Sequence, residues 1–212
     1  MKQILILALI ALIPLNGIAQ GRKYKKSMSR NLEVLAGEPE RESWIACAGQ
    51  FEEISSKYPD RWLPSYYASQ ALTTISLGEQ DIERGDEQLD HAQELLDRAM
   101  ELNPEESEVH TLKALLLLGR MSLDPYSRGA LYYEEYLSTL QKAKNLNPEN
   151  PRVYLLEGIM TLNMPDYMGG GPAAAKPILV EAEKKFSTFH NDDPFWPAWG
   201  ADLNRQQLDQ IE

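Results

Sequence analysis

The tetrapeptide Leu-Asn-Pro-Glu occurs twice in this chain of 212 residues, at 102–105 and at 146–149, a separation of 44 residues. A third Pro, Pro59, lies 45 residues before Pro104. Self-similarity at a fixed period of this size is typical of repeat architectures, in which each supersecondary unit stacks on its neighbours. The repeat therefore limits the fold to a stack of similar units.

Apolar or small residues precede each repeated Pro at one spacing, in steps of four and then three residues. The sets are Cys47, Phe51, Ile54; Ala92, Leu96, Ala99; Tyr136, Leu140, Ala143; and Ala175, Leu179, Ala182, the last without a following Pro. Such steps place all members of a set on one face of a helix. Runs that alternate apolar and polar residues are few, so the sequence predicts an all-α fold.

Each set resembles the second helix of a tetratricopeptide repeat (TPR), and residues 63–77, 105–118 and 149–162 stand where first helices are expected. Gly158 matches the small-residue position at which two helices approach closely, whereas Tyr136 departs from the pattern. The resemblance implies a TPR-like α-solenoid of about four antiparallel helix pairs. Further stretches resemble an exported TPR-like family of Bacteroidota without an established activity. They are residues 51–54, 62–68, 150–152, 169–171 and 199–200.

The observed period exceeds the usual TPR period of about 34 residues by roughly ten. We expect the excess to form extended intra-repeat loops at residues 79–86, 120–129 and 163–172. Because they recur at one phase of the repeat, these loops should line one rim of the solenoid. In this interpretation Asp86 caps the helix that follows the first loop.

Residues 1–19 have the layout of a secretory signal peptide, with Lys2, an apolar run from Ile4 to Leu15 and small residues before Gln20. The apolar run is shorter than the roughly 20 residues that a transmembrane helix needs. We therefore predict an exported protein with no integral membrane segment after cleavage. A periplasmic location is favoured over secretion.

The chain carries 21 Lys and Arg against 32 Asp and Glu, a formal charge of -11. An acidic balance argues against nucleic acid as a partner, because phosphate binding needs a basic surface. Residues 20–30 form a basic N-terminal segment that either docks on an acidic surface or is a solvated terminus. Residues 31–200 are predicted to be the repeat domain, and residues 201–212 a C-terminal tail.

Candidate partner-binding residues lie on the predicted first helices and near them: Tyr67, Glu108, Arg128 and Arg152. Glu108 and Arg152 occupy equivalent positions in successive repeats and should face the concave groove together. They either clamp a peptide, with Arg152 bound to a carboxylate, or pair with each other and join the repeats. The aromatic stretch Phe195, Trp196 and Trp199 is expected to cap the end of the solenoid, the alternative being that it folds back into the groove.

Gly169, Gly170 and Gly171 precede a predicted helix and could turn their N–H groups toward an anion. The simpler interpretation is that they permit a tight turn. His91, His190 and Cys47 form no recognised catalytic or zinc pattern, so no catalytic residue, metal site or cofactor is predicted.

The sequence thus favours a binding protein over an enzyme, with a protein or peptide of the cell envelope as partner. The alternative is a carbohydrate or small-molecule binding protein that uses surface aromatics, with Trp62, Tyr66, Tyr67 and the C-terminal tryptophans as candidates.

Overall fold

The computed structural model describes residues 15–37 and 40–211, and these fold entirely as helices and connecting loops, with no strand. The predicted signal peptide therefore lies largely outside the described residues. The helices are α1 (Leu15–Ala36), α2 (Arg41–Lys57), α3 (Trp62–Ser76), α4 (Ile82–Leu102), α5 (Ser107–Leu123), α6 (Pro125–Leu146), α7 (Pro151–Asn163), the short 3-10 helix η1 (Asp166–Met168), α8 (Pro172–Thr188) and α9 (Ala201–Gln210). No described helix is long and apolar enough to cross a membrane.

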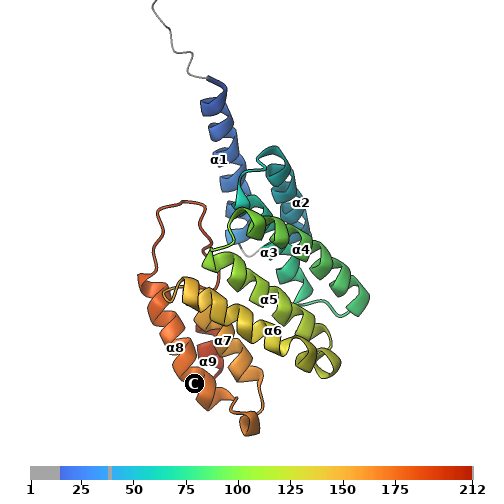
Figure 1. The fold of residues 1–212 in the computed structure, drawn as a ribbon, viewed down its shortest axis with the longest axis vertical. Helices are drawn as coiled ribbons and strands as arrows, with labels where there is room; N and C mark the ends of the chain where they lie inside the picture. The colour runs from blue at the N-terminus through green and yellow to red at the C-terminus, as the bar shows by residue number, and fades with distance from the viewer. Residues whose placement is uncertain (1–14, 38–39, 212) are drawn as a thin grey trace, which may run out of the picture.

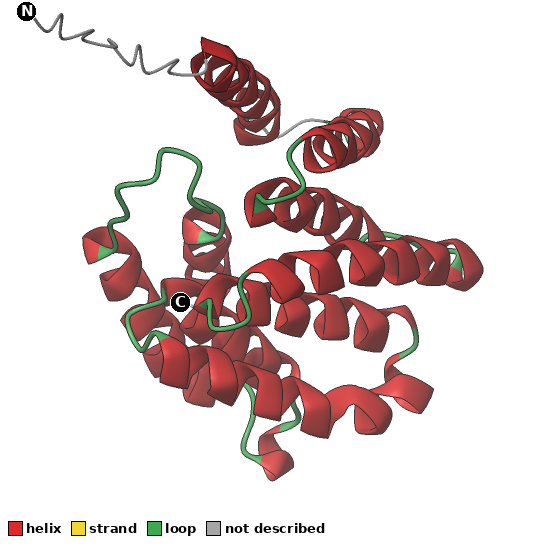
Figure 2. Ribbon diagram, turned by 45° about the horizontal axis from the view of Figure 1, so that its top comes forward, coloured by secondary structure: helices red, strands yellow, loops and turns green. Residues whose placement is uncertain are grey.

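Consecutive helices pair as hairpins, and the hairpins stack one after another from α1 and α2 to α7 and α8 (Figure 1). Figure 2 shows the same stack built only of helices and loops over the described residues. The predicted all-α solenoid of about four helix pairs is confirmed. An additional helix, α9, packs on α8 at the end of the stack.

The four apolar sets predicted from the sequence form the buried stripes of α2, α4, α6 and α8. Phe51, Leu96 and Leu179 have no exposed surface, and Leu140 is 5% exposed. A Cβ added to Gly158 of α7 would lie 2.4 Å from Leu179 Cδ2, so this glycine permits the close approach of α7 and α8. Each helix pair buries its stripe against its neighbours, as a solenoid requires.

The prediction of extended loops is wrong for two of the three segments. Helix α4 already begins at Ile82, and only Asp124 separates α5 from α6, so most of the extra residues lengthen helices. Asp81, not Asp86, caps α4, since its side chain accepts a hydrogen bond from the Arg84 N–H at 3.2 Å. Only residues 163–172 contain the expected loop, and no continuous loop rim forms.

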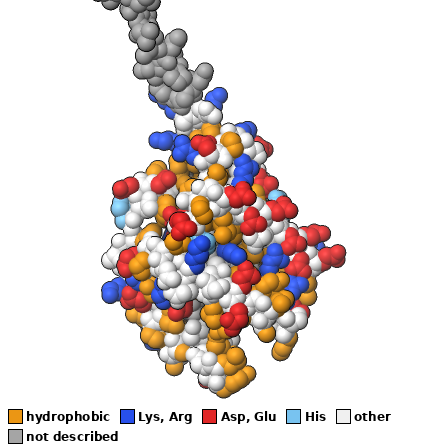
Figure 3. Space-filling view, in the orientation of Figure 1, with side chains coloured by type: hydrophobic (Ala, Val, Ile, Leu, Met, Phe, Trp, Pro, Cys, Tyr) orange, Lys and Arg blue, Asp and Glu red, His pale blue; other side chains and the backbone are white. Residues whose placement is uncertain are grey.

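The basic N-terminal segment is part of α1, and its charged side chains are exposed: Arg22, Lys23, Lys25, Lys26 and Arg30. Figure 3 shows Lys and Arg side chains near the α1 end of the molecule, and Asp and Glu side chains on the side where α4 lies. Met28 and Asn31 of the same helix are buried. The segment is thus docked on the domain through its apolar side, with its charges in solvent.

Candidate functional site

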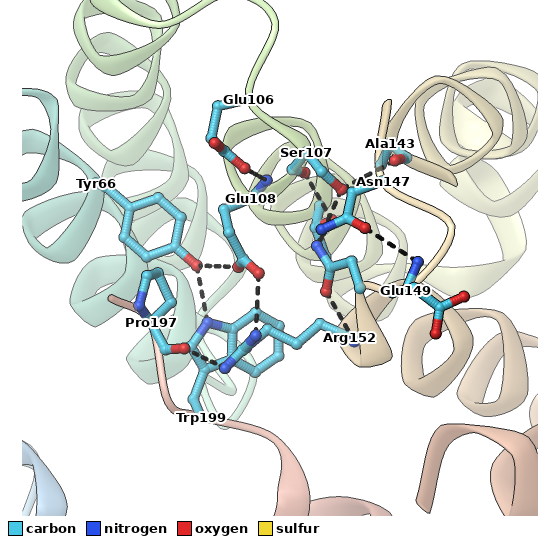
Figure 4. A network of polar contacts seen from close by, with 12 residues as sticks. Tyr66, Glu106, Ser107, Glu108, Ala143, Asn147, Glu149, Arg152, Pro197 and Trp199 are labelled. Carbon is cyan, nitrogen blue, oxygen red and sulfur yellow. Dashed lines mark hydrogen bonds and ion pairs between the residues drawn. The ribbon is translucent and has the colours of Figure 1, made fainter. Parts of the chain in front are cut away.

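Glu108 of α5 and Arg152 of α7 form a buried ion pair. Arg152 Nη1 donates a hydrogen bond to Glu108 Oε1 at 3.0 Å, and the two side chains are 2% and 1% exposed. The repeat period brings them together as expected, and they pair with each other across successive repeats (Figure 4). Burial raises the pKa of the Glu108 carboxyl, and Arg152 opposes that increase.

An aromatic pair completes the polar cluster on the side of Glu108. The Tyr66 hydroxyl donates to Glu108 Oε2 at 3.3 Å and accepts a hydrogen bond from Trp199 Nε1 at 2.8 Å. Burial raises the pKa of Tyr66 well above its usual value, so the hydroxyl stays protonated and can donate. Both oxygens of the Glu108 carboxylate therefore have partners.

The segment between α8 and α9, residues 189–200, folds back over the first helices and fills the groove. The Tyr67 hydroxyl donates to the Phe195 carbonyl at 2.9 Å. Figure 4 shows the second contact, in which Arg152 Nη2 donates to the Pro197 carbonyl. Trp196 packs edge-on against Trp62 of α3, with ring centroids 5.6 Å apart. The prediction that this aromatic stretch caps the solenoid end is wrong, because its rings bind the first helices while α9 covers α8.

Tyr66 and Tyr67 are also not surface aromatics. They are 0% and 4% exposed, and their hydroxyls are engaged within the chain. A carbohydrate that stacks on these two rings would first have to displace residues 189–200. The groove as predicted from the first helices is occupied by the protein itself.

Arg152 is nevertheless not fully satisfied. Its Nε is buried and has no hydrogen-bond partner among the described residues, and the same holds for Nε1 of Trp196. The rings of Phe186, Phe189 and Trp199 surround the guanidinium, with centroids 5.5 to 5.9 Å from its central carbon. A buried donor without a partner costs free energy, about 1–3 kcal/mol.

A pocket of about 260 Å³ opens beside these two donors, between α7, α8 and segment 189–200. Its walls combine apolar residues, among them Phe186, Phe189 and Trp196, with the polar or charged side chains of Arg152, His190, Asn191 and Asp193. Concave apolar sites with a few convergent polar groups are typical of ligand-binding sites. We call this the arginine pocket. The sequence placed Arg152 in a groove and offered the fold-back of Phe195, Trp196 and Trp199 into that groove as the less favoured alternative, which the structure shows.

A second pocket, of about 320 Å³, lies on the other side of segment 189–200, against α1. Tyr24, Arg61, Trp62 and Phe195 contribute to its walls. Burial raises the pKa of Tyr24 to about 12, against the opposing effect of Arg61. This pocket has no unpartnered buried donor comparable to Arg152 Nε among the described residues.

Arg128 belongs to a separate pair. From α6 it binds Asp86 of α4 through both nitrogens, Nη1 to Oδ1 at 2.6 Å and Nη2 to Oδ2 at 2.7 Å. The guanidinium holds the pKa of Asp86 below its usual value. Arg128 lines neither pocket, so the structure does not bring it to Tyr67, Glu108 and Arg152.

The glycine loop lies between α7 and α8, outside both pockets. Gly169 and Gly171 have φ values of 86° and 87°, which favour glycine. The three N–H groups donate to backbone carbonyls within the chain: Gly169 to Asp166, Gly170 to Pro165 and Gly171 to Thr161. These donors are used by the turn itself, and a role of Gly169, Gly170 and Gly171 in binding a partner stays a prediction.

The histidines and the cysteine considered in the sequence form isolated contacts. His91 pairs with Glu52 at 3.2 Å, and His190 with Asp192 at the same distance. Within the described ranges, no group of three or more His, Cys, Asp or Glu side chains is placed to hold a metal ion. Cys47 is buried, and burial raises the pKa of its thiol, as for a packed cysteine.

The fold and site define an all-α, helical-repeat protein with an aromatic pocket around a buried arginine. No protein-family model and no curated protein sequence matches the chain. Among solved structures, the chain is similar to the HusA haemophore from Porphyromonas gingivalis, with a TM-score of 0.80 and 25% sequence identity. The match covers 89% of this chain and 92% of HusA. The likeness supports a binding role more than a catalytic one, while membership of the TPR family is not confirmed.

Proposed function

We propose that this chain is an exported binding protein whose ligand is haem or a related flat tetrapyrrole, and that it binds at the arginine pocket. The observation that carries the proposal is the likeness to a haemophore over nearly the full length of both chains. The predicted signal peptide supports export. The pocket supports a flat ligand with anionic groups, because aromatic rings and a buried arginine line it together, beside an acidic residue of its wall, Asp193.

The residues of the pocket fit the chemistry of such a ligand. Phe186, Phe189 and Trp196 contribute aromatic rings to the pocket wall, and aromatic rings pack well against a flat conjugated ligand. His190 at the rim has a side chain 81% exposed, and imidazole is a common ligand of haem iron. The present volume is below the range of about 300–1,000 Å³ typical of ligand sites. Segment 189–200 must therefore move to admit a whole tetrapyrrole.

A titration of the mature protein, residues 20–212, with haem tests the proposal by haem absorbance and tryptophan fluorescence. We expect saturable binding that Trp196→Ala weakens by about fivefold to a hundredfold, since the stacking of a flat ring on one aromatic side chain contributes about 1–3 kcal/mol. Tyr126→Ala, which removes a fully exposed ring of α6, is the matched control and should bind as the wild type does. The absence of saturation, or equal binding by Trp196→Ala, would contradict the proposal.

A second candidate is the protein or peptide partner predicted from the sequence. The observation in its favour is that Tyr67 and Arg152 already hold two backbone carbonyls of segment 189–200, as a peptide-binding groove would. A photoreactive residue in place of Trp62, beside that segment, should then crosslink one discrete envelope protein in cells. The same residue in place of Tyr126 should not, and identical products from both positions would count against a peptide site.

A further inference from the structure

On one edge of the Arg152 guanidinium, only one of the two N–H donors has an acceptor among the described residues. Nη1 is bound to Glu108, whereas the edge formed by Nε and Nη2 meets a single acceptor, the Pro197 carbonyl, at Nη2. A carbonyl oxygen at Nη2 leaves Nε without a partner. A carboxylate has two oxygens that match this edge in a bidentate contact, which is the geometry for which arginine is best suited.

Arg152 is held in place before any ligand arrives. Its backbone N–H donates to the Asn150 side chain at 3.0 Å, and Asn150 Nδ2 donates in turn to Ser107 and Thr111 of α5 at 3.0 and 3.2 Å. The guanidinium group of Arg152 is fixed by Glu108 and by the surrounding aromatic rings. Because the side chain is already ordered, binding through it loses little conformational entropy.

A second donor lies in the same pocket. Trp196 Nε1 is buried and has no hydrogen-bond partner within the part of the chain that the structure describes. Trp196 directly precedes Pro197, whose carbonyl accepts the hydrogen bond from Arg152. An ionised carboxylate accepts hydrogen bonds at about four lone-pair positions. Two residues that line the arginine pocket, one on α7 and one in segment 189–200, thus each have an unused donor for an anionic group.

We propose that Arg152 is a carboxylate-binding residue, whose Nε–Nη2 edge receives a carboxylate of the ligand in the arginine pocket in exchange for the Pro197 carbonyl. This inference rests on the proposed function and specifies the ligand class: a flat aromatic molecule that bears a carboxylate. Two carboxyl groups oppose a further negative charge there, Asp193 in the pocket wall and Glu108 on the other side of the guanidinium. Replacement of Glu108 by Gln removes one of them and therefore strengthens carboxylate binding, an effect that a purely structural ion pair would not produce.

The test compares two metal-free probes on the full mature chain, protoporphyrin IX and its dimethyl ester, by fluorescence titration. They share the ring and differ in their carboxylates. We expect the free acid to bind about tenfold or more tightly than the ester, the ratio for loss of a charge-assisted hydrogen bond. In Glu108→Gln the affinity for the acid should rise several-fold, while the affinity for the ester stays unchanged.

Arg152→Gln should bring the ratio of the two affinities close to one, provided that circular dichroism shows a folded chain. Arg120→Gln is the matched control, because Arg120 of α5 is likewise an arginine paired with a carboxylate of the preceding repeat, Asp90 at 2.8 Å, but is less buried and lies outside both pockets. It should keep the wild-type ratio. Removing either partner of a buried pair destabilises the fold, so if neither variant folds, the ratio of acid to ester affinity in the wild type still decides the question.

The outcomes separate the two proposals. Equal binding of acid and ester by the wild type would overturn the role of Arg152 and leave the tetrapyrrole function standing. An unchanged or weaker affinity of Glu108→Gln for the acid would also overturn it. Binding of neither probe would overturn both proposals.

Discussion

Among the arginine–carboxylate pairs that join successive repeats of this protein, Arg128–Asp86 and Arg152–Glu108 differ in almost every physical respect. Arg128 and Asp86 are 21% and 32% exposed and match each other completely, two nitrogens to two oxygens. Arg152 and Glu108 are buried and leave Arg152 Nε without a partner. The sequence presents both arginines as similar candidates, about one repeat after an acidic residue. The difference shows what residues 189–200 add: they bury the Arg152–Glu108 pair and make it part of a candidate site.

Burial also changes what each pair does for stability. Exposed ion pairs contribute about 0–1 kcal/mol, since water screens them and two long side chains must be ordered. Breaking a buried pair costs about 3–5 kcal/mol, because one charge remains in a medium that solvates it poorly. The Arg128–Asp86 pair, which we call the surface pair, should therefore be dispensable. The Arg152–Glu108 pair, which we call the buried pair, should not be.

The largest expected effect is that of Arg152→Gln on folding. The variant leaves the Glu108 carboxylate uncompensated, and we expect the free energy of unfolding to fall by about 3–5 kcal/mol. Urea denaturation measures it. The double variant with Glu108→Gln should recover part of the loss, since no buried charge remains. A loss below about 1 kcal/mol would mean that the buried pair behaves like a surface pair.

The contrast also shows which parts of the molecule the sequence can predict. Spacings of four and three residues repeated at a fixed period are enough to identify the buried faces of α2, α4, α6 and α8. The period alone brings Glu108 and Arg152 to the same groove, since residues 44 apart occupy equivalent places in successive repeats. Local periodicity and repetition thus predict the helices and one contact between them.

Helix limits were harder to predict, because local capping chemistry decides them. The segment 120–129 was expected to be a loop, yet α5 and α6 are interrupted only at Asp124. The signal was present: Asp124 precedes Pro125, and Asp at the cap with Pro at the first helical position is a typical helix start. Asp86 was left free to bind Arg128 because Asp81 caps α4 one turn earlier.

The fold-back of residues 189–200 has no counterpart in the repeat and could not be predicted from it. Its path depends on contacts with residues far away in the chain, such as Tyr67 and Trp62. The pocket exists only because of this path. The least periodic segment of the chain thus forms the wall of its candidate site.

The second prediction targets that wall through Gly200, which ends the segment. Its φ is 105°, and an added Cβ would lie 2.9 Å from both Leu155 Cδ2 and Phe186 Cζ. We expect Gly200→Ala to lower the free energy of unfolding by about 1–3 kcal/mol, through backbone strain and overpacking. It should also expose Trp196 to a soluble quencher, as measured by tryptophan fluorescence.

Gly129→Ala is the matched control for this glycine, because it lies inside α6 with nothing within 4 Å of the added Cβ. There we expect a gain of roughly 0.5–1 kcal/mol, since Ala favours a helix over Gly. Equal effects at the two glycines would show that the wall formed by residues 189–200 does not depend on the special backbone of Gly200.

The smallest expected effect is the loss of stability on breaking the surface pair. The contribution of Asp86 to stability should depend on pH in the opposite sense from that of Glu108 in the buried pair. Arg128 lowers the pKa of Asp86, so the stability this carboxylate contributes is present above its unfolded pKa and is lost as pH falls through the lowered value. Burial raises the pKa of Glu108 in the folded protein above its value in the unfolded chain. The free energy of unfolding therefore falls as pH rises through this range, because the unfolded chain loses the proton first.

Arg128→Gln should therefore cost less than about 1 kcal/mol at neutral pH, and this cost should shrink in high salt. The cost should disappear in acid, once Asp86 is protonated in both proteins. Thermal unfolding of wild type and Arg128→Gln, followed from neutral to acidic pH at two salt concentrations, measures the difference. A cost that persists in acid and in high salt would mean that Arg128 stabilises the fold by packing its stem rather than by its charge, and the contrast between the two pairs would then rest on burial alone.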